Sequence, residues 1–444
     1  MSYLNSEQVR EKEGALAING GMPIRSKGLI PEWPGLNWLD EEEKKSVMSV
    51  LENRSPFRFY GPGVRGMCDT LENEFAIRTG AKYALAVNSG SLALYTCLGA
   101  LEVGPGDEVL MPGYLWTSCF NAVIKAGAIP RLVDVDKSFC MCPEDLQKKI
   151  TPNSKVVMYV HMSGTSGDIE KIVGIARKNN LKVLEDCAQS TGASVEGKSI
   201  GTFGDMGIFS FQINKNMTSG EGGMIITSSK HLYNRAFAIH DLGYARDDKG
   251  RLMDTSCAPE YQLWGSGGRM SELTAAMALV QLRKLDRIIG SMRDSKWKIR
   301  QAIEGKIPGI EFRDVIDPDG DSGSFLLCLY PSSEIAQKFI EAMRAEGIRG
   351  EGQSAPCLSM QQWGLHWYYN NLSLVNKRSL TSYGAPWSLE ANSFARNYSY
   401  VKGTLPVTDD FSERGALLSI PSKLSQTDID DIVRAFFKVA AWIL

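Results

Sequence analysis

Histidine is scarce in this sequence, with four residues in 444, and no two of them are spaced as a pair of metal ligands. The nine cysteines form no Cys-x-x-Cys pair, and their number is odd. Metal sites and disulfide frameworks both depend on such spacings. We therefore expect neither a metal site nor a set of disulfides, and we interpret the cysteines in apolar segments as core residues.

An excess of charge of either sign is also lacking. The chain has 49 Lys and Arg against 51 Asp and Glu, a net charge of −2, so its charge does not favour nucleic acid or an anionic membrane as a partner. No apolar run reaches the roughly 18 residues that span a bilayer. The first residues lack the charged start and apolar core of a signal peptide. We expect a cytoplasmic protein.

The order of apolar and polar segments indicates the fold. Residues 1–40 are polar and then rich in glycine and proline, so we expect an arm laid on the surface. Over 82–186, short apolar segments alternate with helical ones, which indicates a mostly parallel sheet covered by helices on both faces. We predict an α/β fold with a large domain over 41–290 and a smaller α+β domain over 291–444. A long helix over 271–304 leads from the first domain to the second.

One lysine lies in an unusual local context. An apolar segment, 206–211, leads to Lys215, and a glycine-rich turn, 218–223, follows it before a second apolar segment. Glycine allows tight turns and close approach to the backbone. A lysine enclosed by apolar residues is partly desolvated, which lowers its pKa and makes it a better nucleophile. The local sequence alone does not distinguish this from a surface lysine in a loop.

A second motif, Asn88-Ser89-Gly90-Ser91, connects an apolar strand to an apolar helix. A helix start reached in this way presents free backbone N–H groups and the positive end of a dipole to an anion. Ser89 and Ser91 add hydroxyl donors. The motif is typical of a phosphate site, although a serine N-cap with nothing bound gives the same pattern.

Other polar and aromatic residues follow neighbouring strands at corresponding positions. They are Tyr114, Trp116, His161 and Asp186. In open parallel sheets, ligands bind at the carboxyl ends of the strands. We therefore expect these side chains to gather near the turn 88–91.

Pyridoxal phosphate requires each of these elements. Its phosphate requires donors at a helix start, and Trp116 could stack on its ring. Asp186 could hold the proton of the pyridine nitrogen by a charge-assisted hydrogen bond. Lys215 could form the Schiff base and then act as general acid and base. Taken singly, Trp116 could be a core residue, Asp186 a helix cap and His161 a structural histidine, but all four elements occur here in one chain.

The motifs resemble those of the DegT/DnrJ/EryC1/StrS family of sugar and cyclitol aminotransferases, within the fold type I pyridoxal-phosphate enzymes. The resemblance runs over about 38–300 and more weakly to the C-terminus. It rests on Asn88-Ser89-Gly90-Ser91, Pro112-Gly113-Tyr114-Leu115-Trp116, Glu185-Asp186-Cys187-Ala188-Gln189, and Phe209-Ser210-Phe211 with Lys215 and Thr218-Ser219-Gly220-Glu221-Gly222-Gly223.

The resemblance implies roles for further residues. Gln189 would lie near the ring hydroxyl, and Ser210 would bind the phosphate with Ser89, Gly90 and Ser91. The lysine at 215, where relatives with a dehydratase mechanism have histidine, favours transamination.

The resemblance also implies an activity. Glutamate or glutamine would donate an amino group to a keto sugar, keto cyclitol or similar polyhydroxylated ketone. The enzyme would be a homodimer with active sites shared across the interface, and Arg269 would serve the partner's site. His161 and Tyr114 are further candidates for contact with substrate. The alternatives are an eliminase, dehydratase or cyclase on the same scaffold, and a cofactor-binding regulatory protein with little turnover.

The sequence departs from the family pattern at two positions. Gly267 stands where the family often has the asparagine that reaches the neighbouring subunit's phosphate, and Ser266 is the candidate to replace it. Gln212 stands where many sugar aminotransferases have histidine. Together with Val160-His161-Met162-Ser163-Gly164 and Tyr244-Ala245-Arg246-Asp247-Asp248, it resembles the branch with 3-amino-5-hydroxybenzoate synthase and the inosose aminotransferases. The aromatic segment 355–405 has no assigned structure, and we expect it to shape the substrate pocket.

Overall fold

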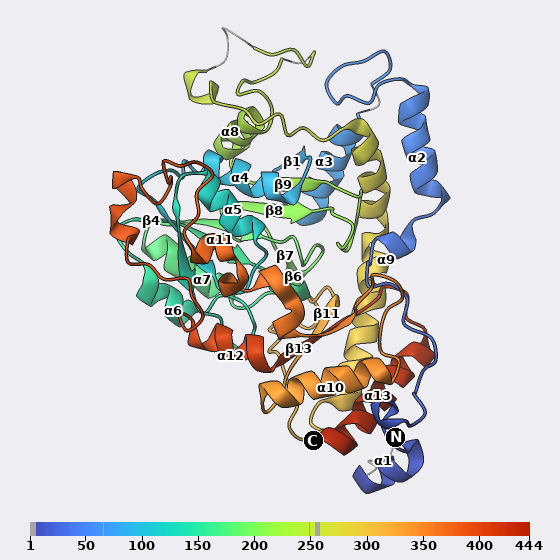
Figure 1. The fold of residues 1–444 in the computed structure, drawn as a ribbon. Helices are drawn as coiled ribbons and strands as arrows, with labels where there is room; N and C mark the ends of the chain where they lie inside the picture. Colours follow the sequence, from blue (N-terminus) through green and yellow to red (C-terminus); the bar gives the residue numbers. More distant parts are fainter. Residues whose placement is uncertain (1–5, 65, 248, 254–257) are drawn as a thin grey trace.

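Two β-sheets organise the chain, one early and one late in the sequence (Figure 1). The computed structural model describes residues 6–64, 66–247, 249–253 and 258–444. The first sheet has seven strands in the order β1-β9-β8-β5-β4-β2-β3. Its strands are β1 (Tyr83–Val87), β2 (Glu108–Pro112), β3 (Ile129–Val133), β4 (Ser154–Val160), β5 (Lys182–Asp186), β8 (Met206–Ser210) and β9 (Gly223–Thr227).

The first sheet is parallel from β3 through β8, and β9 pairs antiparallel with both β8 and β1. Its strands are apolar throughout because both faces are covered. Val156 belongs to one buried cluster and its neighbour Val157 to the other. The predicted α/β fold with a mostly parallel, sandwiched sheet is confirmed.

Each face of this sheet has its own helices. One cluster includes residues of α3 (Met67–Thr79), α6 (Pro143–Lys149), α7 (Ile169–Lys178) and α9 (Glu272–Ile303). The other includes residues of α4 (Gly90–Ala100), α5 (Ser118–Lys125) and α8 (Lys230–His240). Helix α9 begins after Ser271, whose side chain accepts a hydrogen bond from the N–H of Thr274. No helix in the described part of the chain is both long and apolar enough to cross a membrane.

The second sheet is antiparallel, in the order β10-β11-β13-β12. Its strands are β10 (Glu311–Phe312), β11 (Phe325–Leu329), β12 (Cys357–Ser359) and β13 (Gly415–Ser419). The helices in this part of the chain are α10 (Ser333–Ala345), α11 (Leu372–Val375), α12 (Pro406–Arg414) and α13 (Gln426–Ile443). A hairpin of β6 (Ser194–Val195) and β7 (Lys198–Ser199) completes the strands.

The N-terminal arm is more structured than its composition indicates. It contains the helix α1 (Ser6–Glu13), which packs on α13, and it is followed by α2 (Glu41–Glu52) (Figure 1). The carboxylate of Glu346 accepts hydrogen bonds from the N–H groups of Ala17 at 2.8 Å and Ile24 at 3.0 Å. These bonds attach Ala17 and Ile24 of the arm to the end of α10.

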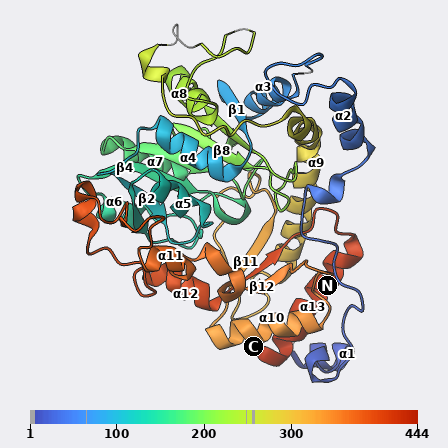
Figure 2. The same ribbon diagram turned by 45° about the horizontal axis from the view of Figure 1, so that its top comes forward.

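The aromatic segment 355–405 forms β12 and then short helices that lie along the large domain (Figures 1 and 2). The hydroxyl of Tyr400 donates to the carbonyl of Pro130 at 2.8 Å, and the side-chain amide of Asn392 donates to the carbonyl of Gly127 at 3.0 Å. The buried aromatic rings hold this part of the chain against the first domain, although it follows the first strands of the second sheet.

Candidate active site

A cavity of about 470 Å³ lies at the carboxyl ends of the strands of the large sheet. Eight residues predicted from the sequence line it together, although they come from five separate parts of the chain. They are Ser89, Gly90, Ser91, Trp116, Asp186, Gln189, Ser210 and Lys215.

Lys215 lies in the tight loop between β8 and β9. Its N–H donates to the carbonyl of Gln212 at 3.0 Å, and the N–H of Ser219 donates to the carbonyl of Phe211 at 2.9 Å. Burial lowers the pKa of the Lys215 amine, and the nearby charge of Asp186 opposes this effect. Among the described residues, none forms a hydrogen bond or ion pair with the amine. It is therefore available as a nucleophile or base.

Asp186 ends β5 and is buried, with 4% of its surface exposed. Its Oδ1 accepts the N–H of Ala188 at 2.9 Å, and its Oδ2 accepts the thiol of Cys119 at 3.1 Å. These two donors fix the plane of the carboxylate. A buried carboxylate held in this way can accept a further hydrogen bond from a ligand in the cavity.

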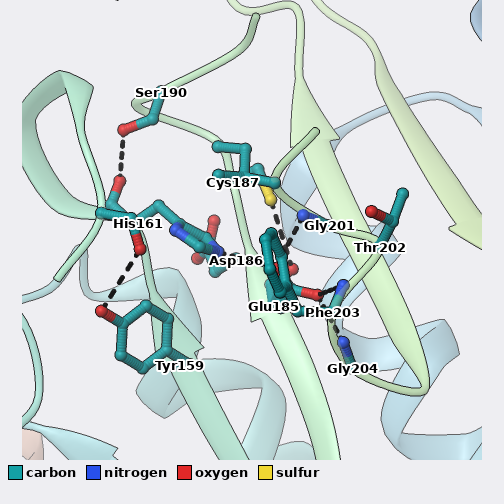
Figure 3. A network of polar contacts seen from close by, with 12 residues as sticks. Tyr159, His161, Glu185, Asp186, Cys187, Ser190, Gly201, Thr202, Phe203 and Gly204 are labelled. Carbon is teal, nitrogen blue, oxygen red and sulfur yellow. Dashed lines mark hydrogen bonds and ion pairs between the residues drawn. The ribbon is translucent and has the colours of Figure 1, made fainter. Parts of the chain in front are cut away.

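The residue before Asp186 anchors this strand end (Figure 3). The carboxylate of Glu185 accepts the N–H groups of Gly201, Phe203 and Gly204, each at 2.7 Å. It also bonds Nε2 of His161 at 2.8 Å. His161, Glu185 and Cys187 lie close enough to resemble a metal site, but the Glu185 oxygens already have four partners. The cluster supports the strand that carries Asp186.

The start of α4 forms a cradle for an anion. The hydroxyl of Ser89 accepts the N–H of Leu92 at 3.2 Å, and the hydroxyls of Ser91 and Ser118 lie 2.7 Å apart. A Cβ added at Gly90 would lie 2.8 Å from the Cβ of Ser210. The glycine is therefore required for Ser210 to approach the helix start, and the hydroxyls and backbone donors there suit a phosphate.

Two rings and an amide line another part of the cavity. The ring centroids of Trp116 and His366 are 4.8 Å apart, and the side-chain nitrogen of Gln189 lies 3.0 Å from Nε2 of His366. The available donors, ring faces and carboxylate fit a flat, phosphorylated pyridine ring.

The three residues predicted with a role at the substrate do not line this cavity. Tyr114 is fully buried and its hydroxyl lies 2.8 Å from that of Ser163. His161 is also fully buried, and its ring bonds the carboxylate of Glu185. Arg269 lies at the large domain's surface in an ion pair with Asp241 at 2.6 Å. In this chain, Tyr114 and His161 serve as packing and hydrogen-bonding residues.

The cavity also contains residues that were not named individually from the sequence, two of them from the aromatic segment 355–405 that we expect to shape the substrate pocket. They include Glu32, Pro34, Ser118, Trp363 and His366. Ser118 follows Trp116 by two positions at the same strand end, and this position could have identified it as a cavity residue from the sequence. Glu32 and Pro34 come from the arm, and Trp363 and His366 from the aromatic segment. Only the tertiary fold brings these four to the site.

The fold and this cavity define a fold type I pyridoxal-phosphate enzyme. The match to a family model extends over residues 38–383. The chain belongs to the DegT/DnrJ/EryC1/StrS aminotransferase family. Enzymes of this family use pyridoxal phosphate, so the predicted cofactor is confirmed at the level of the family.

The curated relatives include enzymes that act on sugars and cyclitols. The chain is 34% identical to 3-amino-5-hydroxybenzoate synthase of Amycolatopsis mediterranei (strain S699) over 63% of this chain and 70% of that protein. It is 38% identical to GDP-perosamine synthase of Escherichia coli O157:H7 over 50% of this chain and 59% of that protein. It is 30% identical to a putative L-glutamine:3-amino-2,3-dideoxy-scyllo-inosose aminotransferase of Streptoalloteichus tenebrarius. That match covers 76% of this chain and 79% of that protein.

Solved structures have the same fold. A crystal structure of 3-amino-5-hydroxybenzoic acid synthase matches with a TM-score of 0.75 and 25% identity, over 93% of this chain and 99% of that one. An aminotransferase from Psychrobacter cryohalolentis matches with a TM-score of 0.73 and 25% identity, over 91% of this chain and 98% of that one. The predicted family and fold class are thus both confirmed.

Proposed function

We propose that this protein is an aminotransferase that moves an amino group from glutamate or glutamine to a keto sugar, keto cyclitol or related polyhydroxylated ketone. One observation carries the proposal. Lys215, Asp186 and the serine-lined start of α4 face one cavity. This is the set of groups that a pyridoxal-phosphate transaminase requires.

Each of these residues would have a distinct role toward the cofactor. Bound here, pyridoxal phosphate supplies an aldehyde that takes up amino groups and a ring that accepts electrons. Ser89, Ser91 and Ser210 bind the phosphate with the N–H groups at the start of α4. Asp186 would accept the hydrogen bond of the protonated pyridine nitrogen. Lys215 would hold the cofactor through its aldehyde, and its amine would carry a proton to and from the substrate carbon.

The same cavity would receive the donor and the ketone. Glu32 and Glu221 line it, together with the amide side chains of Gln212 and Asn214. Carboxylates and amides accept hydrogen bonds from hydroxyl groups, which are the main polar groups of a cyclitol or sugar.

We further propose that the protein acts as a homodimer and that Arg269 contributes to the partner's site. Exposed apolar side chains on the loops near Arg269 support this interface: Trp264 is 95% exposed, Tyr60 61% and Leu242 49%. Gly267 has a φ of +65°, a conformation that glycine and asparagine adopt most readily. This backbone accounts for a glycine at a position where relatives have asparagine.

An elimination or cyclisation reaction on the same scaffold agrees less well with the known relatives than transamination does. The relatives include aminotransferases for scyllo-inosose derivatives and perosamine synthases. Residue 215 is a lysine, as transamination requires. Release of a keto acid from the amino donor separates the two reactions, since only transamination produces it.

The test is an absorption spectrum of the purified protein before and after addition of L-glutamate or L-glutamine. We expect a yellow band that bleaches as keto acid is released. Lys215→Ala should lose that band and all turnover while keeping the far-UV circular dichroism of the wild type. Lys45→Ala, on the exposed face of α2, is the matched control. Full turnover by Lys215→Ala would refute the assignment, and a yellow band that neither donor bleaches would favour elimination.

A further inference from the structure

The segment around His366 is joined to the strand end that carries Trp116. The N–H of Leu115 donates to the carbonyl of His366 at 3.0 Å, and Tyr114 forms a β-bridge with Trp367. The imidazole of His366 stacks on the indole of Trp363 with ring centroids 4.2 Å apart and an interplanar angle of 11°. The imidazole is thereby held rigidly in the wall of the active-site cavity.

The hydrogen bonds of His366 determine its tautomer. Nδ1 lies 2.7 Å from the carbonyl oxygen of Trp363, which can only accept, so Nδ1 carries the proton. Burial lowers the pKa of His366 to about 3, so the ring is neutral at physiological pH. Nε2 is therefore an acceptor, and the group 3.0 Å away on Gln189 must be the amide N–H₂.

The other end of the Gln189 amide supports the same orientation. Its Oε1 accepts the backbone N–H of Ser163 at 3.3 Å. The amide thus has an N–H donor at its oxygen and the His366 acceptor at its nitrogen, and it cannot flip without losing both bonds. No described residue accepts its second N–H, and Gln189 lines the cavity.

We propose that His366 is a positioning residue that holds the free N–H of Gln189 toward the ring oxygen of the cofactor. This inference rests on the proposed function, in which Lys215, Asp186 and the start of α4 would hold pyridoxal phosphate in the cavity that Gln189 lines. An N–H donated to that oxygen favours its deprotonated form. His366 would then help to set the pH at which the bound cofactor loses its proton, without touching the substrate.

The experiment is a titration of the visible band of the bound cofactor against pH. His366→Phe keeps a flat ring beside Trp363 but removes the acceptor for Gln189. We expect its midpoint to lie higher than that of the wild type by on the order of one pH unit. Gln189→Ala should give a similar shift, and the double variant no more than either single change. His366→Gln, whose amide oxygen can accept from Gln189, should restore most of the wild-type midpoint.

The control is His231→Phe, because His231 is an exposed histidine outside this cavity. An unchanged midpoint in a coloured His366→Phe protein would overturn the positioning role. So would shifts of His366→Phe and Gln189→Ala that add in the double variant. A wild-type protein that takes up no coloured cofactor would refute the proposed function itself, which is a distinct result. If His366→Phe does not fold, the comparison of His366→Gln with Gln189→Ala decides the question.

Discussion

The thiol of Cys119 donates a hydrogen bond to Oδ2 of Asp186 across 3.1 Å, and both side chains are buried. Burial raises the pKa of this thiol well above its usual range, so it keeps its proton and remains a donor at neutral pH. Nothing in the sequence distinguishes Cys119 from the other cysteines in apolar segments. In the structure it is one of the two groups that orient the carboxylate proposed to hold the pyridine nitrogen.

Cys119→Ala should therefore lower kcat by about tenfold, because Asp186 loses a donor that fixes its plane. Cys119→Ser keeps a donor and should stay within about threefold of the wild type. Cys328→Ala is the control for packing, since Cys328 is buried in β11 and its thiol bonds no carboxylate among the described residues. Steady-state kinetics at saturating cofactor measures the effect. Equal losses in Cys119→Ala and Cys119→Ser would show that the sulfur acts through its volume alone.

Gly90→Ala tests the phosphate cradle. The added methyl would lie 2.8 Å from Cβ and 3.2 Å from Oγ of Ser210, so Ser210 must move away from the start of α4. We expect the Kd for pyridoxal phosphate to rise tenfold or more in an equilibrium binding measurement, because one phosphate donor is misplaced.

Gly174→Ala is the matched control, because a methyl at Gly174 in α7 meets no atom within 4 Å. Alanine is the better helix former, so Gly174→Ala should stabilise the protein by about 0.5–1 kcal/mol with no change in cofactor affinity. Wild-type affinity in Gly90→Ala would exclude the start of α4 as the phosphate site.

The sequence predicted the covered, mostly parallel sheet because the signals for its strands are local. The strands Tyr83–Val87 and Lys182–Asp186 lie within residues 82–186, where short apolar segments alternate with helical ones. The cavity residues at strand ends were predictable for a related reason. A parallel sheet gathers its carboxyl ends at one edge, so a motif and its position along a strand were enough.

The remaining wall of the site depends on contacts that no local pattern encodes. His366 reaches the cavity because the backbone of Leu115 binds its carbonyl, 251 residues away in sequence. Glu32 reaches it because its Oε1 accepts the N–H of Ala355 at 2.9 Å. Tyr114 and His161 show that a position at a strand end does not by itself bring a side chain into the cavity. They occupy strand ends, but their side chains point into packed interior, where Ser163 and Glu185 bind them.

The arm depends on a buried ion pair. Nζ of Lys438 lies 2.9 Å from Oε2 of Glu346, and both side chains are fully enclosed. The same carboxylate binds the N–H groups of Ala17 and Ile24 in the arm. Glu346→Gln would leave the Lys438 charge uncompensated, so we expect a loss of about 3–5 kcal/mol in unfolding free energy. Limited trypsin digestion should cut faster within the first 40 residues.

The control for that experiment lies on α10, the helix that ends at Glu346. Glu334→Gln breaks the exposed pair with Lys338 in α10, and such a change should alter stability by less than about 0.5 kcal/mol. Adding Lys438→Met to Glu346→Gln removes the buried cation and should recover part of the loss. Unfolding in urea and the rate of trypsin cleavage measure both effects. Similar losses from Glu346→Gln and Glu334→Gln would show that the buried pair does not hold the arm.

Two buried histidines make stability depend on pH in a defined direction. Burial lowers the pKa of both His366 and His240 to about 3, against about 6.5 in the unfolded chain. Between these values the unfolded state binds protons that the folded state does not, so stability falls as the pH drops below about 6.5. Each histidine accounts for on the order of 2 kcal/mol of the loss at pH 5.

His366→Phe removes one of these groups and should reduce the loss of stability between pH 7.5 and pH 5 by about 2 kcal/mol relative to the wild type. His231→Phe, at an exposed histidine, is the control for the loss of one histidine. Urea unfolding of the protein without added cofactor, followed by circular dichroism, measures the difference. The carboxylates common to all three proteins cancel in the comparison. A pH dependence in His366→Phe equal to that of the wild type would mean that His366 is protonated in the folded protein. It could then no longer accept the N–H of Gln189.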